Sequence, residues 1–204
     1  MRKKPTQQRS RQLVNDIIEA AGQVIAREGM DALTTNRVAE AAGVSIGSLY
    51  QYFYDRSDIL EAVLDKVSQD MMQMFNQQLN TINLQAFDIR TLARMGLAVS
   101  FAYMRSNPLY LALIQNWNRL PIHRLFDPLE QYILAMSRTY FLQRVNAPQP
   151  PHLETRLYVL FNSTVFTLAR FISQNNPMIK EELVLDCLAE NIAMALEAAP
   201  LSAA

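Results

Sequence analysis

A stretch of 23 residues, from Thr34 to Arg56, constrains the fold of this chain more than any other. Its pattern predicts two short helices joined by a tight turn. Thr34 or Thr35 can cap the first helix, because a threonine hydroxyl accepts a hydrogen bond from a free backbone N–H in the first turn. Gly43 stands where that helix ends and where left-handed backbone is often required, and Ser45 can cap the second helix. The stretch therefore predicts a helix-turn-helix.

The second of these helices is too short to be a core element, and its predicted outer surface carries no charge. At about 100° per residue, the inner side is apolar and holds Ile46, Leu49 and Phe53, with Tyr50 at its edge. The opposite arc holds Gly47, Ser48, Gln51 and Tyr52. A solvated helix more often carries Lys and Glu in that position, whereas small polar side chains suit close approach to a DNA groove.

The residues of this stretch also carry a family resemblance. The pattern is Thr34-Thr35-x-x-Val38-Ala39-x-x-Ala42-Gly43-Val44-Ser45-x-Gly47-Ser48-Leu49-Tyr50-x-Tyr52-Phe53-x-x-Arg56. It resembles, without a gap, the signature of the TetR family of bacterial transcription regulators. The resemblance covers the N-terminal quarter of the chain. It implies a three-helix DNA-binding head, joined by a long helix to a helical bundle that binds a ligand and dimerises.

The composition independently favours an all-α chain. Half of the 204 residues are hydrophobic and only five are glycine, while β-branched residues form no alternating runs of strand length, so we expect no sheet. We expect three regions: a basic flexible arm over 1–9, a helix-turn-helix DNA-binding domain over 10–56, and a helical effector-binding and dimerisation domain over 57–204.

Charge is distributed unevenly although the formal net charge is zero. Residues 1–56 carry eight Lys or Arg side chains against six Asp or Glu, and the first eleven residues hold five basic side chains and no acid. A basic arm ahead of a DNA-reading unit can follow the phosphate backbone. The alternative is a disordered, solubilising tail.

The sequence predicts a cytoplasmic protein without a membrane segment. The basic N-terminus lacks a following apolar region, so it is not a secretory signal. No apolar run reaches the ~18 residues of a membrane span. The single cysteine, Cys187, excludes an intrachain disulfide and is expected to be a small core residue on a helical apolar face.

Helical spacing of apolar residues continues along the rest of the chain. It predicts helices over residues 10–28, 57–79, 89–105, 109–118, 125–145, 152–174 and 178–199. Ser57 or Asp58 can cap the second of these. Because that helix begins beside the DNA-reading unit and runs for about 30 Å, it is the candidate lever between the two parts of the chain.

Nothing in the sequence supports catalysis or metal binding. It contains no G-x-S-x-G, H-E-x-x-H, P-loop or dinucleotide-binding glycine pattern. The two histidines, His123 and His152, each lie near a proline, and spacing supplies neither with partners for a metal site or a general base. We therefore expect no enzyme, metal or cofactor.

The DNA-contact residues divide into two sets. The resemblance implies phosphate contacts at Thr35, Ser45, Tyr50, Tyr52 and Arg56, whose hydroxyl and cationic groups suit phosphate oxygens. Candidates for base readout are Asn36, Ile46, Gly47, Ser48 and Gln51, because amides can pair with adenine, Ile can touch a thymine methyl and Gly permits close approach. The alternative for Tyr50 is packing beneath the helix, and Arg37 can be either solvated or a contact.

Beyond residue 70 the chain is rich in methionine and aromatic residues. Such stripes usually form a core, yet they also line adaptable apolar pockets, and the resemblance implies an effector pocket. The candidate lining residues are Phe75, Met95, Phe101, Met104, Trp117, Phe126, Met136, Tyr140 and Phe161. Few charges fall within these stripes, which favours an apolar or aromatic effector, although Arg94, Arg105 or Arg138 could instead anchor an acidic group.

Each of the last two predicted helices carries an apolar stripe that is broader than a single neighbouring helix could bury. The resemblance implies that they pair with a partner's copies in a four-helix bundle. The candidate interface residues are Leu157, Thr164, Leu168, Leu185, Leu188 and Ile192. The alternative is that these helices only close the core of a single chain.

We therefore expect a homodimeric DNA-binding regulator, a repressor that a small apolar or aromatic effector releases from a pseudo-palindromic operator. One alternative keeps the DNA binding and removes the small-molecule effector, as in a constitutive or partner-controlled regulator, or an activator. A second alternative, from another class, is a helical lipid-binding protein or enzyme with an incidental helix-turn-helix.

Overall fold

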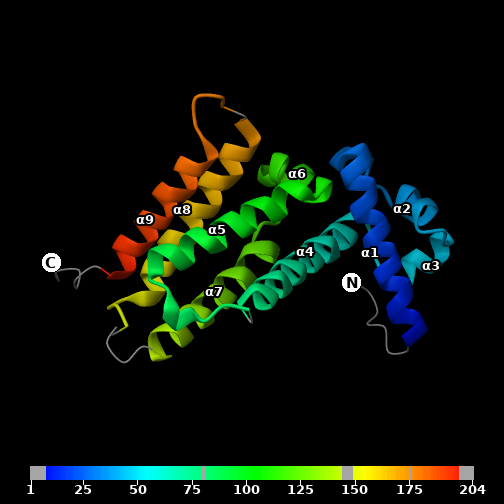
Figure 1. The fold of residues 1–204 in the computed structure, drawn as a ribbon. Coiled ribbons are helices and arrows are strands. Elements are labelled where there is room, and N and C mark those ends of the chain that lie inside the picture. Colours follow the sequence, from blue (N-terminus) through cyan, green and yellow to red (C-terminus); the bar gives the residue numbers. More distant parts are fainter. Residues whose placement is uncertain (1–7, 80, 144–148, 175, 198–204) are drawn as a thin grey trace. The chain divides into compact units, whose positions relative to one another are not determined.

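The computed structural model describes residues 8–79, 81–143, 149–174 and 176–197 (Figure 1). Helices dominate these ranges and none of their residues lies in a strand, which confirms the all-α prediction. The helices are α1 (Gln8–Glu28), α2 (Thr35–Ala41), α3 (Ile46–Tyr50), α4 (Arg56–Leu79), α5 (Ile89–Ser106), α6 (Pro108–Gln115), α7 (His123–Gln143), α8 (Leu153–Gln174) and α9 (Glu181–Glu197). No described helix is apolar over a length that could cross a membrane.

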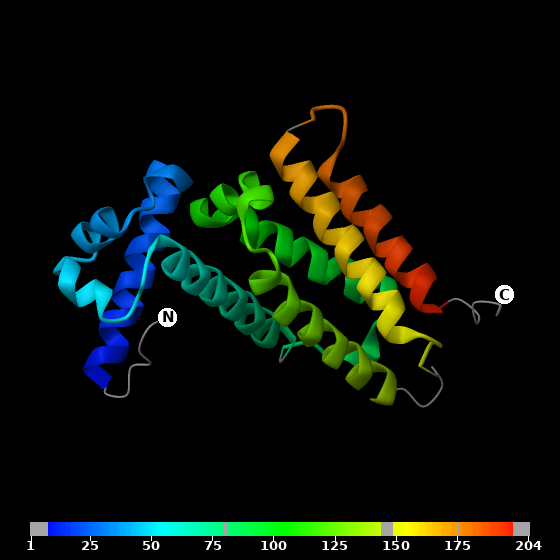
Figure 2. The same cartoon turned by 180° about the vertical axis from the view of Figure 1, so that it is seen from behind.

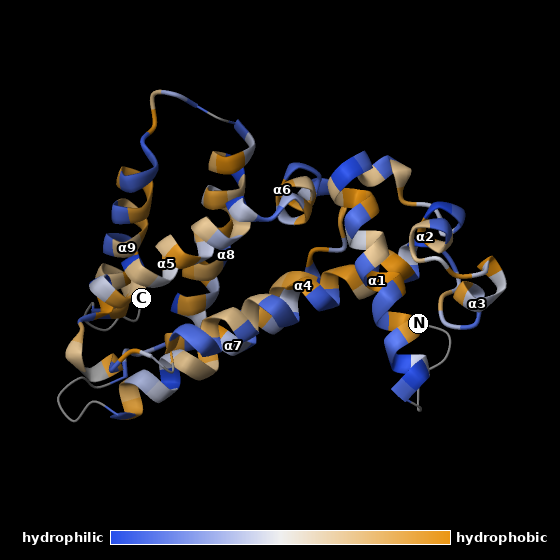
Figure 3. Cartoon of the chain, turned by 45° about the vertical axis from the view of Figure 1, so that its right-hand side comes forward, coloured by the Kyte–Doolittle hydropathy of each residue, from blue (hydrophilic) through white to orange (hydrophobic). Residues whose placement is uncertain are grey.

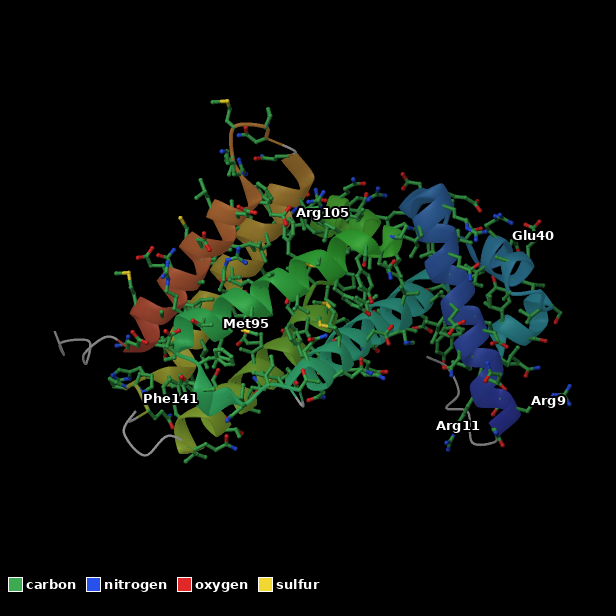
Figure 4. All side chains as sticks on the ribbon, viewed as in Figure 1. Arg9, Arg11, Glu40, Met95, Arg105 and Phe141 are labelled. Atoms are coloured by element: carbon green, nitrogen blue, oxygen red, sulfur yellow. The ribbon has the colours of Figure 1, made fainter. Side chains whose placement is uncertain are left out.

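The predicted basic arm falls mostly outside the structure. Its residues 1–7 lie outside the described residues, and α1 already includes Arg9 and Arg11, whose side chains are exposed. The first turns of α1 are hydrophilic (Figure 3), and Figure 4 shows both arginines projecting from the ribbon there.

The long helix α4 begins at Arg56, within one residue of its predicted start, but its cap differs from the prediction. Asp55 Oδ1 accepts from the backbone N–H of Ser57 at 2.8 Å and of Asp58 at 3.1 Å. Asp58 Oδ2 accepts from the backbone N–H of Tyr54 at 2.9 Å. A carboxylate one residue before the helix thus binds the free N–H groups of the first turn, so the prediction that Ser57 or Asp58 is the cap was wrong.

The chain packs as two compact units. The first comprises the residues up to Asp70 together with residues 105–126, and the second comprises residues 71–104 and 127–204. The helix α4 contributes residues to both. These units are defined by packing, whereas the predicted boundary at residue 56 is functional and stays a prediction.

The core of the first unit is built on the predicted apolar stripe of α1. Ile17, Ile25, Leu49, Phe53 and Ile59 are each completely buried. They come from α1, from α3 with the turn after it, and from the start of α4. A helix-turn-helix cannot bury enough apolar surface alone. Here large apolar side chains of the two short helices pack against α1 and α4.

Helix α6 joins the first unit by packing against α1, far from it in sequence. Gly22 of α1 is buried, and a Cβ built there would lie 3.1 Å from Leu109 Cδ2 of α6. That distance is shorter than ordinary van der Waals contact, so the Leu109 side chain would have to shift by a few tenths of an ångström to admit a side chain at position 22. Glycine therefore lets Leu109 pack directly against α1.

The second unit has two apolar clusters formed by α5, α7, α8 and α9. One contains Ile89, Tyr140, Phe141, Leu153, Leu157, Ala193 and Leu196. The other contains Leu97, Phe101, Leu168, Leu185, Leu188 and Ala189. Helices α8 and α9 lie side by side in both views (Figures 1 and 2). Each contributes to both clusters, so this pair forms one wall of the core.

Cys187 lies on α9 but not in this core. Its side chain is exposed, while its neighbours Leu188 and Ala189 are buried. The prediction of a core cysteine was wrong, because the buried side of α9 follows Leu185, Leu188, Ala189 and Leu196, and position 187 falls outside that row.

Candidate nucleic-acid interface

The first helix of the helix-turn-helix ends in hydrogen bonds that require a left-handed residue. The N–H of Val44 donates to Ala39 O at 3.0 Å, and the N–H of Gly43 donates to Glu40 O at 3.1 Å. This is the Schellman arrangement, and Gly43 adopts the φ of +66° that it needs. At the other end, Thr34 Oγ1 accepts from the N–H of Arg37 at 3.2 Å. Thr34, rather than Thr35, is therefore the cap.

The second helix starts with the predicted serine cap. Ser45 Oγ accepts from the N–H of Ser48 at 3.0 Å and lies 2.8 Å from Ser48 Oγ. The helix itself is only the five residues Ile46–Tyr50. Leu49 is completely buried beneath it, which fixes the opposite side toward solvent.

Most of the predicted DNA contacts lie on accessible surface of this element. Exposed residues are Asn36, Ser45, Ile46, Gly47, Tyr50, Gln51 and Arg56, and half-buried ones are Thr35 and Ser48. Their alcohol, phenol, amide and guanidinium groups are the kinds that bind phosphate oxygens and base edges. The roles themselves stay predictions.

Three side chains face differently from the helical projection. Tyr52 is only 8% exposed although it was expected on the outer arc, whereas Tyr50 is 41% exposed and Ile46 38%. For Tyr52 the reason is that α3 ends at Tyr50, so a rotation of about 100° per residue no longer applies there. The sequence left open that Tyr50 packs beneath the helix. In the structure it is Tyr52, not Tyr50, whose side chain is buried.

The hydroxyl of Tyr50 makes a contact that connects the two helices. Tyr50 Oη lies 3.2 Å from Thr35 Oγ1, and either oxygen can be the donor. Thr35 is the first residue of α2 and Tyr50 is the last of α3. The contact thus brings together two hydroxyls that were assigned independently to phosphate binding.

Gly47 is not required by the packing of the chain itself. A Cβ built at this position would meet nothing closer than Ser45 Oγ, at 3.8 Å. Gly47 also lies within a helix, where glycine is less stable than alanine by up to about 1 kcal/mol. The free space above an exposed glycine is what close approach of a partner needs.

Arg37, which the sequence left open between solvent and a contact, is held by two carboxylates. Its Nη2 lies 2.5 Å from Glu28 Oε1, its Nε 2.9 Å from Glu28 Oε2, and its Nη1 2.9 Å from Glu40 Oε2. Hydrogen bonding to Arg37 lowers the pKa of Glu28 and raises that of the guanidinium. The spacing of Arg37 and Glu40 was a usable signal for the second pair, whereas the pair with Glu28 depends on how α1 and α2 pack.

The predicted effector-pocket residues are divided between the two units. Trp117 and Phe126 belong to the first unit, and Phe75, Met95, Phe101, Met104, Met136, Tyr140 and Phe161 belong to the second. Within the second unit, Phe101, Tyr140 and Phe161 are buried, and Phe75 stacks on Tyr132 with ring centroids 6.2 Å apart. Met95, labelled on α5 in Figure 4, is half-buried, like Met104 and Met136. A shared pocket stays a prediction.

Two of the three arginines considered for an acidic effector already have carboxylate partners. Arg94 Nε lies 2.6 Å from Asp186 Oδ1, and Arg138 pairs with Glu154. These pairs reduce the positive charge available to a ligand.

Most of the predicted interface residues face the chain's own core, so their role in a dimer stays a prediction. Leu157, Leu168, Leu185 and Leu188 are at most 8% exposed, and all four belong to the chain's own apolar clusters. Thr164 and Ile192 are half-buried. The exposed side instead carries Tyr158, Val159, Phe166, Leu183 and Met194, each at least 48% exposed. Both the buried side and the exposed side of these helices carry apolar residues. The spacing of apolar residues along the sequence therefore did not show which side is buried.

Comparison with known proteins finds its family match in the region that contains the helix-turn-helix. Residues 17–63 match the family model described as bacterial regulatory proteins, tetR family. The nucleoid occlusion factor SlmA of Haemophilus ducreyi is 32% identical over 108 residues, which are 53% of this chain and 50% of that protein. The chain thus matches only about half the length of this relative.

Solved structures share the fold of nearly the whole chain. A TetR-family transcriptional regulator from Streptomyces coelicolor has a TM-score of 0.67 at 19% identity, with coverage of 91% of this chain and 96% of that one. The transcriptional regulator FadR from Bacillus subtilis, in complex with stearoyl-CoA, has a TM-score of 0.64 at 14% identity, with coverage of 89% and 98%. The helix-turn-helix at residues 35–50 thus lies within residues 17–63, the part of the chain that matches the bacterial regulatory proteins of the tetR family.

Proposed function

We propose that this chain is a homodimeric DNA-binding transcriptional regulator, a repressor that a small apolar or aromatic effector releases from a pseudo-palindromic operator. The observation that carries the DNA binding is Gly47: an exposed helical glycine with open space at its Cβ position, 3.8 Å from the nearest atom. It is flanked by exposed or half-buried hydroxyl groups of Ser45, Ser48 and Tyr50. A surface of this kind lets a helix approach base edges while hydroxyls bind the phosphates on either side.

Dimerisation is proposed through the exposed apolar side of α8 and α9. Tyr158, Val159 and Phe166 of α8 and Leu183 and Met194 of α9 are exposed large apolar side chains on adjacent helices. Clustered exposure of this kind typically marks a protein interface. Two-fold pairing would give two helix-turn-helix units, and such a protein recognises an operator with matching two-fold symmetry.

An apolar effector is proposed for the second unit. The regulator FadR, of similar fold, was solved with stearoyl-CoA, whose acyl chain is apolar. In this chain Arg94 and Arg138 pair with Asp186 and Glu154, which supports an apolar rather than an acidic ligand. The effector acts only if it binds the DNA-bound and released conformations with different affinities.

A second candidate keeps the DNA binding without a small-molecule effector. It is favoured by the similarity to SlmA, a nucleoid occlusion factor, over about half of this chain. Such a protein would be constitutive or controlled by a partner.

The test begins with selection of fragments of bacterial genomic DNA by the purified protein. We expect enriched inverted repeats, bound with an affinity that falls steeply as salt increases. Fatty acids, acyl thioesters and aromatic compounds are then screened by thermal shift and by release from the selected site. Enrichment without any releasing compound favours the second candidate, whereas failure to enrich any sequence contradicts both.

A further inference from the structure

The first unit contains a cavity that none of the predicted effector-binding residues line. It has a volume of about 320 Å³ and lies between α1, α4 and the beginning of α6. This volume falls at the lower end of the ~300–1,000 Å³ typical of small-molecule sites, and the cavity is widely open to solvent on the side of Glu19 and Gln23. All of its lining residues belong to the first unit.

The cavity exists because α1 presents small residues toward α6. Gly22 and Ala26 lie one helical turn apart on α1, and both line the cavity. At Gly22 the helices approach so closely that a Cβ would lie 3.1 Å from Leu109 Cδ2. Ala26 is half-buried and leaves space beside this contact. The apolar surface comes from Val63 and Val67 of α4 and Leu109 of α6.

The charges that line the cavity do not balance. Lys66 and Asp70, one turn apart on α4, form an ion pair with each other. Glu19 of α1 also lines the cavity, and the described residues include no ion-pair partner for it. One carboxylate therefore remains at the mouth of a mostly apolar cavity, next to the amide of Gln23 one turn further along α1.

We propose that this cavity binds a small organic cation, an ammonium group attached to an apolar or aromatic body. The ammonium would pair with the Glu19 carboxylate, and the body would lie against Val63, Val67 and Leu109. An anion would be repelled by Glu19, since the charge of Asp70 is neutralised by Lys66, and a neutral compound would gain no charge pairing with Glu19. The buried ring of Tyr110, 4% exposed, also lines the cavity and suits an aromatic body.

The site is separate from the proposed effector pocket and does not depend on whether the chain regulates transcription. A ligand there would touch α1, α4 and α6 at once. It would stabilise their packing, because a compound that binds only the folded state raises the free energy of unfolding.

The probe is phenethylamine, which is protonated at neutral pH, used with the full chain. Its controls are 2-phenylethanol, which is neutral and has the same carbon skeleton, and 3-phenylpropionate, which is anionic. Binding is followed by ¹H–¹⁵N NMR. We expect saturable shifts at Gly22, Ala26 and Val67 with the amine, and binding of both controls weaker by about tenfold or more, as for loss of a hydrogen bond to a charged group.

Two variants test the site directly. Glu19→Gln should weaken amine binding by about tenfold, whereas Asp16→Asn, an exposed carboxylate on the same helix outside the cavity, should leave it unchanged. Ala26→Leu should fill the cavity and abolish binding, with circular dichroism used to verify that the chain still folds. Equal binding of the three compounds, undiminished binding to the Glu19→Gln variant, or no saturable shift at the lining residues would each overturn the proposal.

Discussion

The hydroxyls of Thr35 and Tyr50, fifteen residues apart in the chain, lie 3.2 Å from each other across the helix-turn-helix. One stands at the start of α2 and the other at the end of α3. Because each hydroxyl carries a single hydrogen, one of the two donates to the other, and the accepting hydroxyl keeps its own hydrogen for a phosphate oxygen.

The Tyr50→Phe variant tests this pair by removing one hydroxyl. Because Tyr50 is 41% exposed, we expect a loss of at most about 1 kcal/mol in the free energy of unfolding, measured by urea denaturation. Operator affinity, measured by fluorescence anisotropy, should fall by about tenfold if the phenol also binds a phosphate. Thr35→Val alone and combined with Tyr50→Phe completes a double-mutant cycle, and strictly additive effects would show that the two hydroxyls are not coupled.

Gly47→Ala separates folding from DNA binding. The new methyl group has room, 3.8 Å from the nearest atom, and alanine stabilises a helix relative to glycine, so the free energy of unfolding should rise by up to about 1 kcal/mol. Operator affinity should nevertheless fall, because the methyl group would stand between the helix and the groove.

The matched control for that variant is Gly96→Ala in α5. Gly96 is also helical, and nothing lies within 4 Å of a Cβ built there. A similar gain in stability with unchanged operator affinity is expected. An equal loss of affinity in both variants would mean that Gly47 has no special role at the interface.

Arg156 is buried, and its guanidinium binds backbone carbonyls of two segments. Its Nε donates to Pro151 O at 2.9 Å, and its Nη1 donates to Ala195 O in the last turn of α9. Arg156→Met retains much of the aliphatic packing but leaves both carbonyls without this donor. We expect a loss of about 2–3 kcal/mol in the free energy of unfolding, measured by denaturant titration. The control is Arg90→Met, at an exposed arginine. It should change the free energy of unfolding by less than about 0.5 kcal/mol.

Acid should weaken the hydrogen bond between the Asp58 carboxylate and the turn that precedes α4. The backbone N–H of Tyr54 donates to the Asp58 carboxylate and lowers its pKa below the usual 3.8. Because the pKa is lower in the folded state, Asp58 contributes stability above pH 3.8 that is lost as the pH falls through its folded pKa. The difference in free energy of unfolding between wild type and Asp58→Asn should therefore shrink below pH 3.8. A difference that is constant from pH 7 to pH 3 would contradict this role.

The proposed dimer surface can be disrupted without touching the core. Val159 is 57% exposed on α8, so Val159→Lys should leave the single chain folded while it places a charge in the apolar interface. Analytical ultracentrifugation should show a shift from dimer to monomer. Leu168→Ala, which truncates a buried side chain, should instead cost about 2–5 kcal/mol of stability. A Val159→Lys variant that remains fully dimeric would place the interface elsewhere.

Local sequence was a good guide wherever neighbouring residues decide the structure. The glycine turn at Gly43 and the Ser45 cap follow from interactions within a few residues, and both occur as predicted. The length of α4 follows from a sustained spacing of apolar residues. The cap at Asp55 was missed because three candidates within four residues, Asp55, Ser57 and Asp58, could serve, and the choice depended on where the preceding turn ended.

Residues with partners far along the chain were predicted less well. Leu157 and Val159 are two residues apart on α8, yet one is buried in the chain's own core and the other is exposed. Only the position of α5, α7 and α9 decided which side of that helix is internal. Cys187 was misplaced for the same reason.

By itself, the sequence determined the helices, the glycine turn and the family of the DNA-reading element, since hydrogen bonds and caps within one or two turns specify them. The tertiary structure alone decided which apolar side of α8 and α9 is free, how Arg37 and Arg156 are satisfied, and that Gly22 and Ala26 border a cavity. These features depend on contacts between helices distant in the chain, and periodicity within one helix carries no information about which neighbour covers each side.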